Sequence, residues 1–333
     1  MIKIAINGYG RIGRGVHRII MNSDDIELVA INSGADAASH AYLLKYDSLY
    51  GKCDADIKTD GADLIVNGKR IAVYQIRDPK DVDWKKHDVD IVIESTGKFT
   101  EMEDVKKHLE AGAKKVLVTA PCNDEGIPNI VMGVNDEEVD LDKFKVVSNA
   151  SCTTNCLAPV MKVLHKEFTV EKAFVNTVHA FTYTQNLLDN SNPEDFRRAR
   201  ATMESIIPTS TGAMKAIGKV IPELKGKIDG MAFRVPVPTV SCIYVVAKLA
   251  KNVTVEQVNT AFKKYEEGEL HGILGTSVEP LVSVDFRGDE RSSIVDLPNT
   301  KVLPDGFVQI VAWYDNEWGY ISRVVDLVRW FSA

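Results

Sequence analysis

A cysteine in a polar setting is the residue of this chain with the clearest chemical potential. Cys152 lies in the segment Ser-Cys-Thr-Thr-Asn-Cys (151–156), directly before the apolar run 157–164. This spacing places the thiol in the first turn of a predicted helix. There, unpaired N–H groups and the positive end of the helix dipole stabilise a thiolate. Because a thiolate is a nucleophile at neutral pH, Cys152 is a candidate for covalent catalysis.

The other cysteines are Cys53, Cys122, Cys156 and Cys242, and we interpret them as structural or incidental. They form no CxxC pair and show no cysteine–histidine spacing typical of zinc, so no metal site is expected. An odd number of free thiols favours a reducing compartment.

A cysteine nucleophile needs a base, and His179 is the best candidate among seven histidines. It ends the predicted buried strand 175–179, whereas the other histidines lie in polar, helical or loop contexts. A buried histidine that is merely hydrogen-bonded in the core is the alternative interpretation. Cysteine–histidine pairs are a recurrent means of activating a nucleophile, which favours the catalytic role.

The N-terminal part predicts a dinucleotide site. A strand at 2–6 runs into Gly8, Gly10 and Gly13, spaced as GxGxxG, and a helical pattern and a second strand at 26–32 follow. In this context the glycines permit a tight turn, a close approach of the backbone to a pyrophosphate and helix–sheet packing. The helix N-terminus then binds the phosphates.

The rest of the first half continues the alternation of strands and helices, which predicts a doubly wound parallel sheet of the Rossmann type. Ligands bind at the carboxyl ends of such strands. We therefore expect Thr96, Gly97, Thr119 and the segment 148–152 on one rim, with the cofactor and the thiol at the same edge. The strands are predicted at 89–94, 115–119, 129–133 and 145–148, with a helix at 103–111.

The second half changes pattern and predicts an α+β domain on a largely antiparallel sheet. Its longer strands, 173–181, 230–237 and 240–249, are expected to have hairpin-like connections. Thr254-Val-Glu-Gln257 is a capping box that opens a helix to about 267. We predict a dinucleotide-binding domain at 1–150, a catalytic domain at 151–316 and a C-terminal helix at 317–333 that packs back on the first domain.

Length and composition fit a globular enzyme. A chain of 333 residues favours two domains, and its apolar fraction of 45% and charged fraction of 26% are ordinary. The net charge of −7 argues against nucleic acid as a partner. No apolar run approaches the ~20 residues of a membrane span. With a strand starting at Ile2, no signal peptide is expected, which favours a cytoplasmic location.

A dinucleotide and a nucleophilic cysteine together indicate a reaction class. Attack of Cys152 on an aldehyde gives a hemithioacetal, and loss of hydride to a nicotinamide gives a thioester. A second nucleophile then releases an acyl product. A purely hydrolytic cysteine enzyme does not need the dinucleotide motif.

At this point the chain resembles the phosphorylating glyceraldehyde-3-phosphate dehydrogenase family from end to end. SNASCTTNCLAP is among the most diagnostic motifs of that family. The resemblance rests on INGYGRIGR (6–14), ESTGKF (94–99), SNASCTTNCLAP (148–159), the segment 179–182, RRAR (197–200), IIPTSTGA (206–213), RVPVP (234–238) and WYDNEWGY (313–320).

The resemblance implies that Cys152 is the nucleophile and His179 its base, which also steadies the developing oxyanion. It implies glyceraldehyde 3-phosphate and inorganic phosphate as substrates, a role in glycolysis or gluconeogenesis, and a homotetramer. The implied substrate-phosphate residues are Thr182 and Arg234, and the inorganic-phosphate residues are Ser151, Thr153, Arg198, Thr211 and Gly212. The cofactor-binding residues, from the motif and the resemblance together, are Asn7, Gly8, Gly10, Arg11, Ile12, Gly13, Asn32, Ser33, Arg77, Thr96, Gly97, Thr119, Asn190, Ser191 and Asn316.

Two departures from the common family pattern concern the cofactor. Asn32 stands where the family commonly has Asp, and Asn190-Ser191 stands where it has an apolar residue and Pro. Asp at the end of the second strand accepts hydrogen bonds from the ribose hydroxyls and repels a 2′-phosphate. Asn32 and Ser33 remove that charge and are expected to offer donors, as are Asn190 and Ser191. We therefore expect NADP to be used at least comparably to NAD, with neutral drift in an NAD enzyme as the alternative.

Two other functions stay open at this stage. Erythrose-4-phosphate dehydrogenase is a close relative, although Thr182 and the phosphate-site residues favour the three-carbon substrate. A non-enzymatic interaction or RNA-binding role is the other alternative. The intact Cys152 and His179 and the acidic net charge count against it as the main function.

Overall fold

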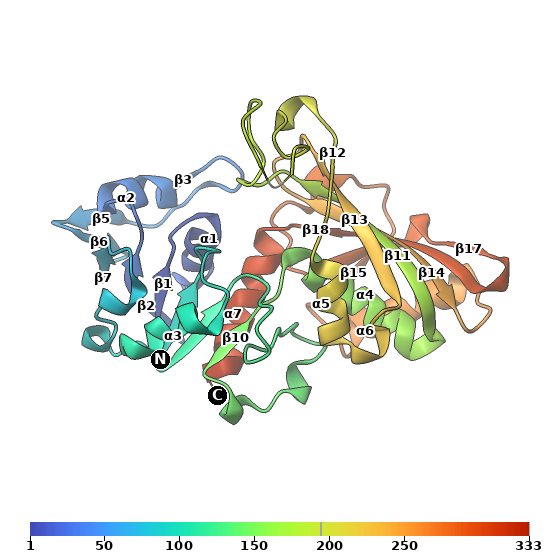
Figure 1. The fold of residues 1–333 in the computed structure, drawn as a ribbon, viewed down its shortest axis with the longest axis horizontal. Helices are drawn as coiled ribbons and strands as arrows, with labels where there is room; N and C mark the ends of the chain where they lie inside the picture. Colours follow the sequence, from blue (N-terminus) through green and yellow to red (C-terminus); the bar gives the residue numbers. More distant parts are fainter. Residues whose placement is uncertain (194, 333) are drawn as a thin grey trace. The chain divides into compact units, whose positions relative to one another are not determined.

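The computed structural model describes residues 1–193 and 195–332 (Figure 1). The chain divides into two compact units. Unit 1 comprises 1–130, 138–150 and the chain from Ile321 onward; unit 2 comprises 131–137 and 151–320. The division at 150/151 falls directly before Cys152.

Unit 1 is built on an eight-stranded sheet, as far as the described residues go, with the order β10-β9-β8-β1-β2-β7-β6-β5. The strands from β10 to β7 are parallel, and β5 and β6 extend the β7 edge as antiparallel strands. This confirms the predicted doubly wound parallel sheet. The strands are β1 (Ile2–Asn7), β2 (Ile26–Asn32), β5 (Ile57–Asp60), β6 (Asp63–Val66), β7 (Lys69–Tyr74), β8 (Ile91–Glu94), β9 (Lys115–Val118) and β10 (Val146–Ser148), with a small hairpin of β3 (Tyr46–Asp47) and β4 (Gly51–Lys52). The helices are α1 (Arg11–Ile20), α2 (Ala37–Lys45), α3 (Met102–Glu110) and α7 (Trp318–Ser332).

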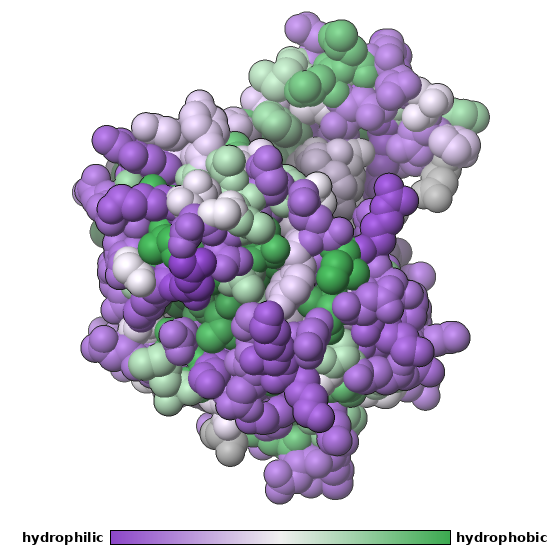
Figure 2. Space-filling view, turned by 90° about the vertical axis from the view of Figure 1, so that its left-hand side faces the viewer, coloured by the Kyte–Doolittle hydropathy of each residue, from purple (hydrophilic) through white to green (hydrophobic). Residues whose placement is uncertain are grey.

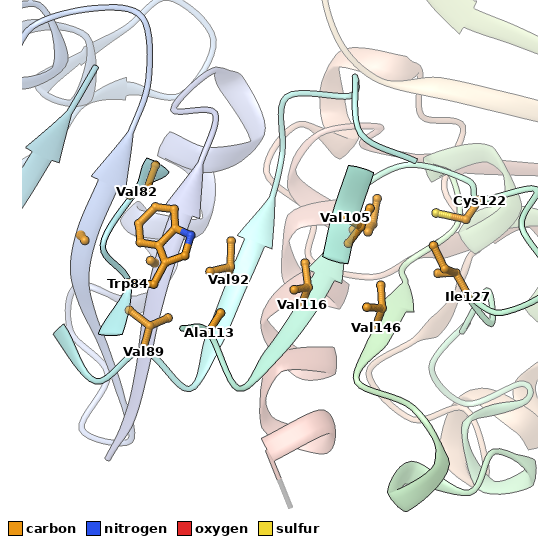
Figure 3. Close-up of a cluster of buried hydrophobic side chains, with 13 residues drawn as sticks. Val82, Trp84, Val89, Val92, Val105, Ala113, Val116, Cys122, Ile127 and Val146 are labelled. Carbon is orange, nitrogen blue, oxygen red and sulfur yellow. The ribbon is translucent and has the colours of Figure 1, made fainter. Parts of the chain in front are cut away.

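A buried cluster fixes one face of this sheet (Figure 3). Val92 of β8, Val116 of β9 and Val146 of β10 point to the same side, where Val105 of α3 and the fully buried Trp84 complete the core. Each of these side chains is removed from water, which is the main favourable term in folding. The continuous burial of β8 is typical of a parallel strand covered on both faces.

The turn between β1 and α1 depends on its glycines. Gly8 has φ +95, and a Cβ there would lie 2.7 Å from the carbonyl carbon of Ser95. A Cβ on Gly13 would lie 2.5 Å from the Gly8 carbonyl oxygen, so Gly13 lets α1 approach the strand end. Gly10 faces open space, which leaves the N-terminus of α1 accessible. Further along α1, Gly15 packs against Ile321, so α7 lies beside α1 within unit 1.

Unit 2 contains a second eight-stranded sheet in the described part of the chain, in the order β12-β13-β11-β14-β18-β16-β15, with β17 paired to β18. Most neighbours are antiparallel, which confirms the predicted α+β class. Helix α4 packs against β11, β14, β16 and β18 and against α5 and α6. The strands are β11 (Val170–Ala180), β12 (Ile207–Thr209), β13 (Ile228–Val235), β14 (Ser241–Leu249), β15 (Leu274–Ser277), β16 (Ser293–Asp296), β17 (Lys301–Leu303) and β18 (Phe307–Tyr314). The helices are α4 (Cys152–Phe168), α5 (Ala213–Val220) and α6 (Val255–Glu267).

Some of the local sequence patterns in unit 2 predict its structure correctly, and others do not. The capping box is confirmed, because Thr254 accepts from the N–H of Gln257 and the Gln257 side chain accepts from the N–H of Thr254. The hairpin-like connections expected between the long strands are wrong, since β13 and β14 both pair with β11 and not with each other. Strands β11 and β13 are parallel neighbours, and the chain between them forms β12 and α5.

The strand predicted at 129–133 is also wrong. Only an isolated bridge from Asn129 to Ser148 forms there. The side chain of Asn129 instead binds both backbone groups of Cys122, which diverts this segment from the sheet.

A buried polar pair under the glycine turn makes the stability of unit 1 sensitive to acid. The hydroxyl of Tyr9 lies 2.5 Å from Nδ1 of His17, and both side chains are buried. Burial lowers the pKa of His17 from 6.5 to about 3. Below pH 6.5, His17 is protonated in the unfolded chain but stays neutral in the folded chain until the pH approaches 3. His17 therefore costs stability as the pH falls from 6.5 toward 3.

We expect Tyr9→Phe to cost about 1–3 kcal/mol, because it leaves a buried ring nitrogen without its partner. The double variant Tyr9→Phe/His17→Leu should cost less, since it removes both polar groups. It should also reduce the loss of stability by up to about 1.4 kcal/mol per pH unit below pH 6.5. Urea unfolding at pH 7 and pH 5 measures both effects. A double variant as unstable as the single one at both pH values would contradict this account.

Candidate active site

The N-terminus of α4 presents the thiol. Cys152 is the first residue of the helix, and Ser151 caps it by accepting from the N–H of Thr154 at 3.1 Å. The preceding residue, Ala150, is buried with φ 52, a left-handed conformation that non-glycine residues rarely adopt. A strained residue held by its surroundings, here two positions before the nucleophile, is typical of functional turns. The predicted place of Cys152 in a first helical turn is observed.

Cys152 and His179 meet across unit 2. Sγ of Cys152 lies 3.5 Å from Nε2 of His179, which is the last residue but one of β11 and is 3% exposed. Burial raises the pKa of the Cys152 thiol, opposed by the charge of Arg234 and hydrogen bonds from Thr153. Burial, followed by the charge of Arg234, lowers the pKa of His179 to about 3. Burial, the largest cause of each shift, favours the neutral thiol and the neutral imidazole, and it opposes the thiolate that the helix N-terminus is expected to stabilise.

Arg234 of β13 controls the proton on His179. Its Nη1 lies 2.6 Å from Nδ1 of His179, and a guanidinium only donates, so this contact requires an unprotonated Nδ1. The carbonyl oxygen of Ala180, 2.7 Å from the same nitrogen, only accepts and requires a proton on Nδ1. One tautomer cannot satisfy both contacts. With Arg234 in place, the ring proton is on Nε2, and Nε2 cannot accept a proton from Cys152.

Tyr314 belongs to this site and was not predicted. Its hydroxyl lies 3.0 Å from Oγ1 of Thr153 and 2.9 Å from Oγ1 of Thr177. Its ring packs edge-on against His179 with centroids 5.9 Å apart. Tyr314 thus ties α4 to β11 and fixes the plane of the imidazole. The only signal in the sequence is its place in the motif 313–320, at the end of a strand.

Two of the predicted phosphate-binding residues of unit 2, Arg198 and Arg234, are arginines whose charges interact. Arg198 Nε donates to Oγ1 of Thr209 and pairs with Asp195. Arg234 is close enough to Arg198 for their charges to interact, and its Nε is buried with no hydrogen-bond partner among the described residues. Two guanidinium groups with a spare donor suit an anion.

The hydroxyl residues of this set lie at loop and helix starts. The N–H of Thr182 donates to Gln185, and its hydroxyl lies 2.9 Å from that of Thr184. Thr211 accepts from the N–H of Ala213 at 3.2 Å, directly before α5, and Gly212 is the N-cap residue of that helix. These positions leave hydroxyl and N–H donors at the loop ends.

Asn316 is buried and held in one orientation. The N–H of Ala180 donates to Oγ of Ser241 at 3.0 Å, and this hydroxyl donates to Oδ1 of Asn316 at 2.9 Å. Within the described residues, Nδ2 of Asn316 has no partner, so it remains as a donor for a ligand. This chain of bonds connects Asn316 to the residue that follows His179.

In unit 1 the residues fit a dinucleotide at the glycine turn. Helix α1 begins with Arg11 and Ile12, and its first turn contains no acidic residue. The space beside Gly10, directly before the helix, is open. Arg11 is fixed by a bidentate contact with Asp47 at 3.0 and 3.3 Å. An uncapped helix N-terminus approached through a glycine is suited to a pyrophosphate. Among the described residues, no cluster that could hold a metal ion is found.

The carboxyl ends of β8, β9 and β10 bring the predicted rim residues of unit 1 together. The N–H of Thr119 donates to the carbonyl oxygen of Glu94 at 2.9 Å, and Thr96 and Gly97 follow β8 directly. Ser33 is bound through its N–H to Tyr74 at 2.9 Å, and Arg77 is exposed. No described helix is long and apolar enough to cross a membrane.

The expectation that Asn32 offers free donors is wrong. Its Nδ2 donates to Oδ1 of Asn7 at 2.7 Å and to the carbonyl oxygen of Ile76 at 2.9 Å. Its Oδ1 accepts from the N–H of Ile76 at 2.9 Å. Both amide hydrogens are therefore in use. Asn190 and Ser191 lie exposed in unit 2, and the Oδ1 of Asn190 accepts from the N–H of Ser191.

Comparison with known protein families gives two matches, one in the N-terminal part of the chain and one in the C-terminal part. Residues 2–102 match the family model described as glyceraldehyde 3-phosphate dehydrogenase, NAD binding domain. Residues 151–316 match glyceraldehyde 3-phosphate dehydrogenase, C-terminal domain. The chain is 54% identical over 332 residues to the glyceraldehyde-3-phosphate dehydrogenase of Priestia megaterium, covering 100% of this chain and 98% of the relative.

Two further relatives show the same coverage. The glyceraldehyde-3-phosphate dehydrogenase of Geobacillus stearothermophilus is 54% identical over 100% of this chain and 98% of its own. Glyceraldehyde-3-phosphate dehydrogenase 1 of Bacillus subtilis is 52% identical over 99% of this chain and 98% of its own. The similarity therefore spans both units.

We expect His179→Asn to raise the pH at which Cys152 is alkylated by iodoacetamide by about one unit, because it removes the Nε2–H donor that lies 3.5 Å from Sγ and stabilises the thiolate. Rates of alkylation from pH 6 to 10 measure this shift. His271→Asn, which changes an exposed histidine of the same unit, is the matched control and should leave the profile unchanged. An identical profile for His179→Asn would show that the two residues are not paired.

Proposed function

Because the chain belongs to the glyceraldehyde-3-phosphate dehydrogenase family, we propose that it oxidises glyceraldehyde 3-phosphate with inorganic phosphate to 1,3-bisphosphoglycerate, and catalyses the reverse reaction. It is an NAD(P)-dependent oxidoreductase with unit 1 as the dinucleotide-binding domain and unit 2 as the catalytic domain. The observation that supports this most directly is the 3.5 Å contact between Cys152 and His179, at a site with two nearby guanidinium groups.

The chemistry of the thiol follows from its neutral resting state. Sγ of Cys152 attacks the aldehyde carbon while its proton passes to Nε2 of His179, and a hemithioacetal forms. Nε2–H then faces the substrate oxygen and stabilises its charge. The C–H bond of this charged hemithioacetal then breaks as hydride, which leaves the thioester of Cys152 and a protonated His179. Attack by inorganic phosphate releases the acyl phosphate, and the departing thiolate of Cys152 takes the proton back from His179.

Arg234 makes this sequence depend on the substrate. In the ligand-free chain its Nη1 lies on Nδ1 of His179 and keeps the ring proton on Nε2. A substrate phosphate draws the guanidinium away, because a charge-assisted contact is stronger than one to a neutral ring. Nδ1 then donates to the carbonyl oxygen of Ala180, and Nε2 becomes free to accept the proton of Cys152. Thr182 contributes to the substrate phosphate. Ser151, Thr153, Arg198, Thr211 and Gly212 contribute to the inorganic phosphate.

NAD(P), when bound, accepts the hydride at its nicotinamide. The chain contributes the N–H groups at the start of α1 for the pyrophosphate and Nδ2 of Asn316 for the nicotinamide amide. Thr96, Gly97 and Thr119 line the rim, and Asn32, Ser33 and Arg77 lie on the adenosine side. Comparable use of NADP remains a prediction. Its basis is now the missing carboxylate at position 32, since the donors of Asn32 are in use.

The exposed apolar surfaces of unit 2 support a homotetramer. The outer face of its sheet exposes Phe174, Val178, Tyr244 and Phe307 at 68%, 38%, 36% and 43%. The loop 181–206 exposes further large side chains, and Figure 2 shows apolar groups at its tip, at the top of the view. Monomers seldom expose such surfaces. The five cysteines are all unpaired, which supports a reducing compartment such as the cytoplasm.

We expect mass photometry to give a tetramer for the unmodified chain. The double variant Phe174→Glu/Tyr244→Glu, with two charges on the sheet face, should dissociate to smaller species. Glu substitution of Val255, an exposed apolar residue at the start of α6, is the control and should leave the tetramer intact. A monomeric unmodified chain would contradict the proposal.

We expect Cys152→Ser to lose nearly all dehydrogenase activity and to keep cofactor binding, since a hydroxyl is far less ionised than a thiol at neutral pH. Cys156→Ser is the matched control: Cys156 lies one turn along α4, buried against Ser293, and its substitution should preserve most of the activity. NAD(P)H formation from glyceraldehyde 3-phosphate, with and without phosphate, measures both variants. Substantial turnover by Cys152→Ser would exclude the covalent mechanism. Faster turnover of erythrose 4-phosphate would assign the alternative substrate.

We expect His179→Asn to lower the rate by roughly 10²–10⁴, the usual range for loss of a positioned base. The same NAD(P)H assay measures it. The cofactor affinity should stay unchanged, because His179 is not among the residues that we propose to hold the cofactor. A rate within about twofold of the unmodified chain would show that another group takes the proton.

A further inference from the structure

A carboxylate beside one of the phosphate-site arginines of unit 2 has no part in the chemistry described so far. Oδ2 of Asp195 lies 3.3 Å from Nε of Arg198, in the loop before β12 (Figure 1). Its Oδ1 accepts from the N–H of Arg197 at 3.0 Å, and its own N–H donates to Oδ1 of Asn192 at 3.1 Å. Among the described residues, Asp195 is the only carboxylate within ion-pair distance of Arg198. A turn closed by these bonds therefore holds a negative charge at one edge of the guanidinium.

Thr209 of β12 fixes the same edge of the guanidinium without a charge. Its Oγ1 accepts from Nε of Arg198 at 2.8 Å, because a guanidinium only donates. The single proton of this hydroxyl then goes to Oδ2 of Asp195, at 3.3 Å. Thr209 is buried, and its bond to Nε is the shorter of the two. Thr209 thus orients the guanidinium, whereas Asp195 adds the charge.

The opposite edge of Arg198 is the one that an anion can reach. Within the described parts of the chain, Nη1 and Nη2 of Arg198 have no partner. They are the paired donors that suit a phosphate. The charge of Arg198 acts on Arg234, which also interacts with the thiol of Cys152. An anion at Nη1 and Nη2 therefore lies in the field of both arginines, and the carboxylate of Asp195 repels it from behind.

We propose that Asp195 weakens phosphate binding at Arg198 and so keeps the phosphate exchangeable. This rests on the proposed function in that Arg198 binds the inorganic phosphate. Without the carboxylate, two guanidinium groups hold the phosphate dianion and, after its attack on the thioester, the new phosphoryl group of the acyl phosphate. A product held in this way leaves slowly. Asp195 touches neither the phosphate nor the thioester, and it acts only through the charge beside Arg198.

The test is Asp195→Asn in the full-length chain, with the KM of inorganic phosphate measured in the oxidation of glyceraldehyde 3-phosphate. The amide keeps the shape of the side chain: its oxygen accepts from the N–H of Arg197, and its nitrogen donates to the second lone pair of Thr209 Oγ1. The charge is what is lost. We expect the KM of phosphate to fall about three- to fivefold at low ionic strength, since a dianion loses a like charge behind one guanidinium. The KM of glyceraldehyde 3-phosphate should change less, because its phosphate is assigned to Thr182 and Arg234.

Salt dependence separates the effect of charge from that of shape. The side chain of Asp195 is 29% exposed, and with Thr209 it lines a cavity of about 630 Å³, so dissolved ions reach it. Raising the ionic strength from about 0.01 M to about 1 M shortens the Debye length from about 30 Å to about 3 Å. The ratio of the phosphate KM values of the unmodified chain and Asp195→Asn should therefore fall toward one. A change of shape alone gives a ratio that salt does not alter.

Two variants control for effects other than the charge at Arg198. Asp189→Asn removes a carboxylate of the same loop that pairs with Arg200 at 3.1 Å, and it should leave the KM of phosphate unchanged. Thr209→Val removes the neutral partner of Nε and keeps the carboxylate, so it should not lower this KM. Asp195→Ser, whose hydroxyl can accept from the N–H of Arg197, also removes the charge and decides the question if Asp195→Asn does not fold.

Three results would overturn the proposal. The first is a phosphate KM that is unchanged or raised in Asp195→Asn, or in Asp195→Ser if the former does not fold. The second is a ratio that does not respond to salt. The third is an equal fall in Asp189→Asn, in Thr209→Val or in the KM of glyceraldehyde 3-phosphate.

A chain that does not oxidise glyceraldehyde 3-phosphate contradicts the proposed function alone. The rise of Tm with added inorganic phosphate then compares the same variants, because a bound ligand stabilises the folded chain. At equal phosphate and equal ionic strength, Asp195→Asn should show the larger rise. An equal or smaller rise would contradict the role of Asp195 without any reference to activity.

Discussion

Burial of the reacting pair is the constraint on which the rest of unit 2 depends. A thiol and an imidazole removed from water both favour their neutral forms, as the raised pKa of Cys152 and the lowered pKa of His179 show. Neutral groups transfer a proton at little cost only if each is held in the correct geometry and tautomer. Tyr314 holds the plane of His179, and Ala180 and Arg234 compete for its Nδ1. The surrounding polar contacts thus decide when the buried pair reacts.

The same physics operates in unit 1 at the ends of parallel strands. Asn7, Asn32 and Glu94 end β1, β2 and β8, where the sheet ladder stops and the side chains enter the core. A buried polar group without a partner costs more than its hydrogen bond contributes, so each amide takes the orientation that its neighbour requires. The orientation of a side chain that contacts a ligand is therefore set by residues that do not contact the ligand.

Much of this could be predicted from the sequence. The glycine turn, the helix start at Cys152, the strand end at His179 and the capping box at Thr254 depend on neighbours within a few positions, and the structure has them where the pattern indicates. The failures depend on distant partners. The segment 129–133 reads as a strand by its apolar residues, yet the side chain of Asn129 draws it into contacts with Cys122. The pairing of β11 with β13 joins positions 55 apart, such as Ala173 and Ile228, and no local period describes it.

The direction of a side-chain hydrogen bond could not be predicted from the sequence. An asparagine has equal numbers of amide hydrogens and acceptor lone pairs, and its type alone does not tell which of them a ligand meets. For Asn32 the answer depends on partners 25 and 44 positions away, and Asn7 in turn depends on one 87 positions away. For His179 it depends on Arg234, 55 positions away. The backbone groups of Ile76 remove the ambiguity for Asn32, and the guanidinium of Arg234 removes it for His179. At each site, the neighbour whose donor and acceptor groups cannot exchange roles therefore decides which atoms the other residues present to a ligand.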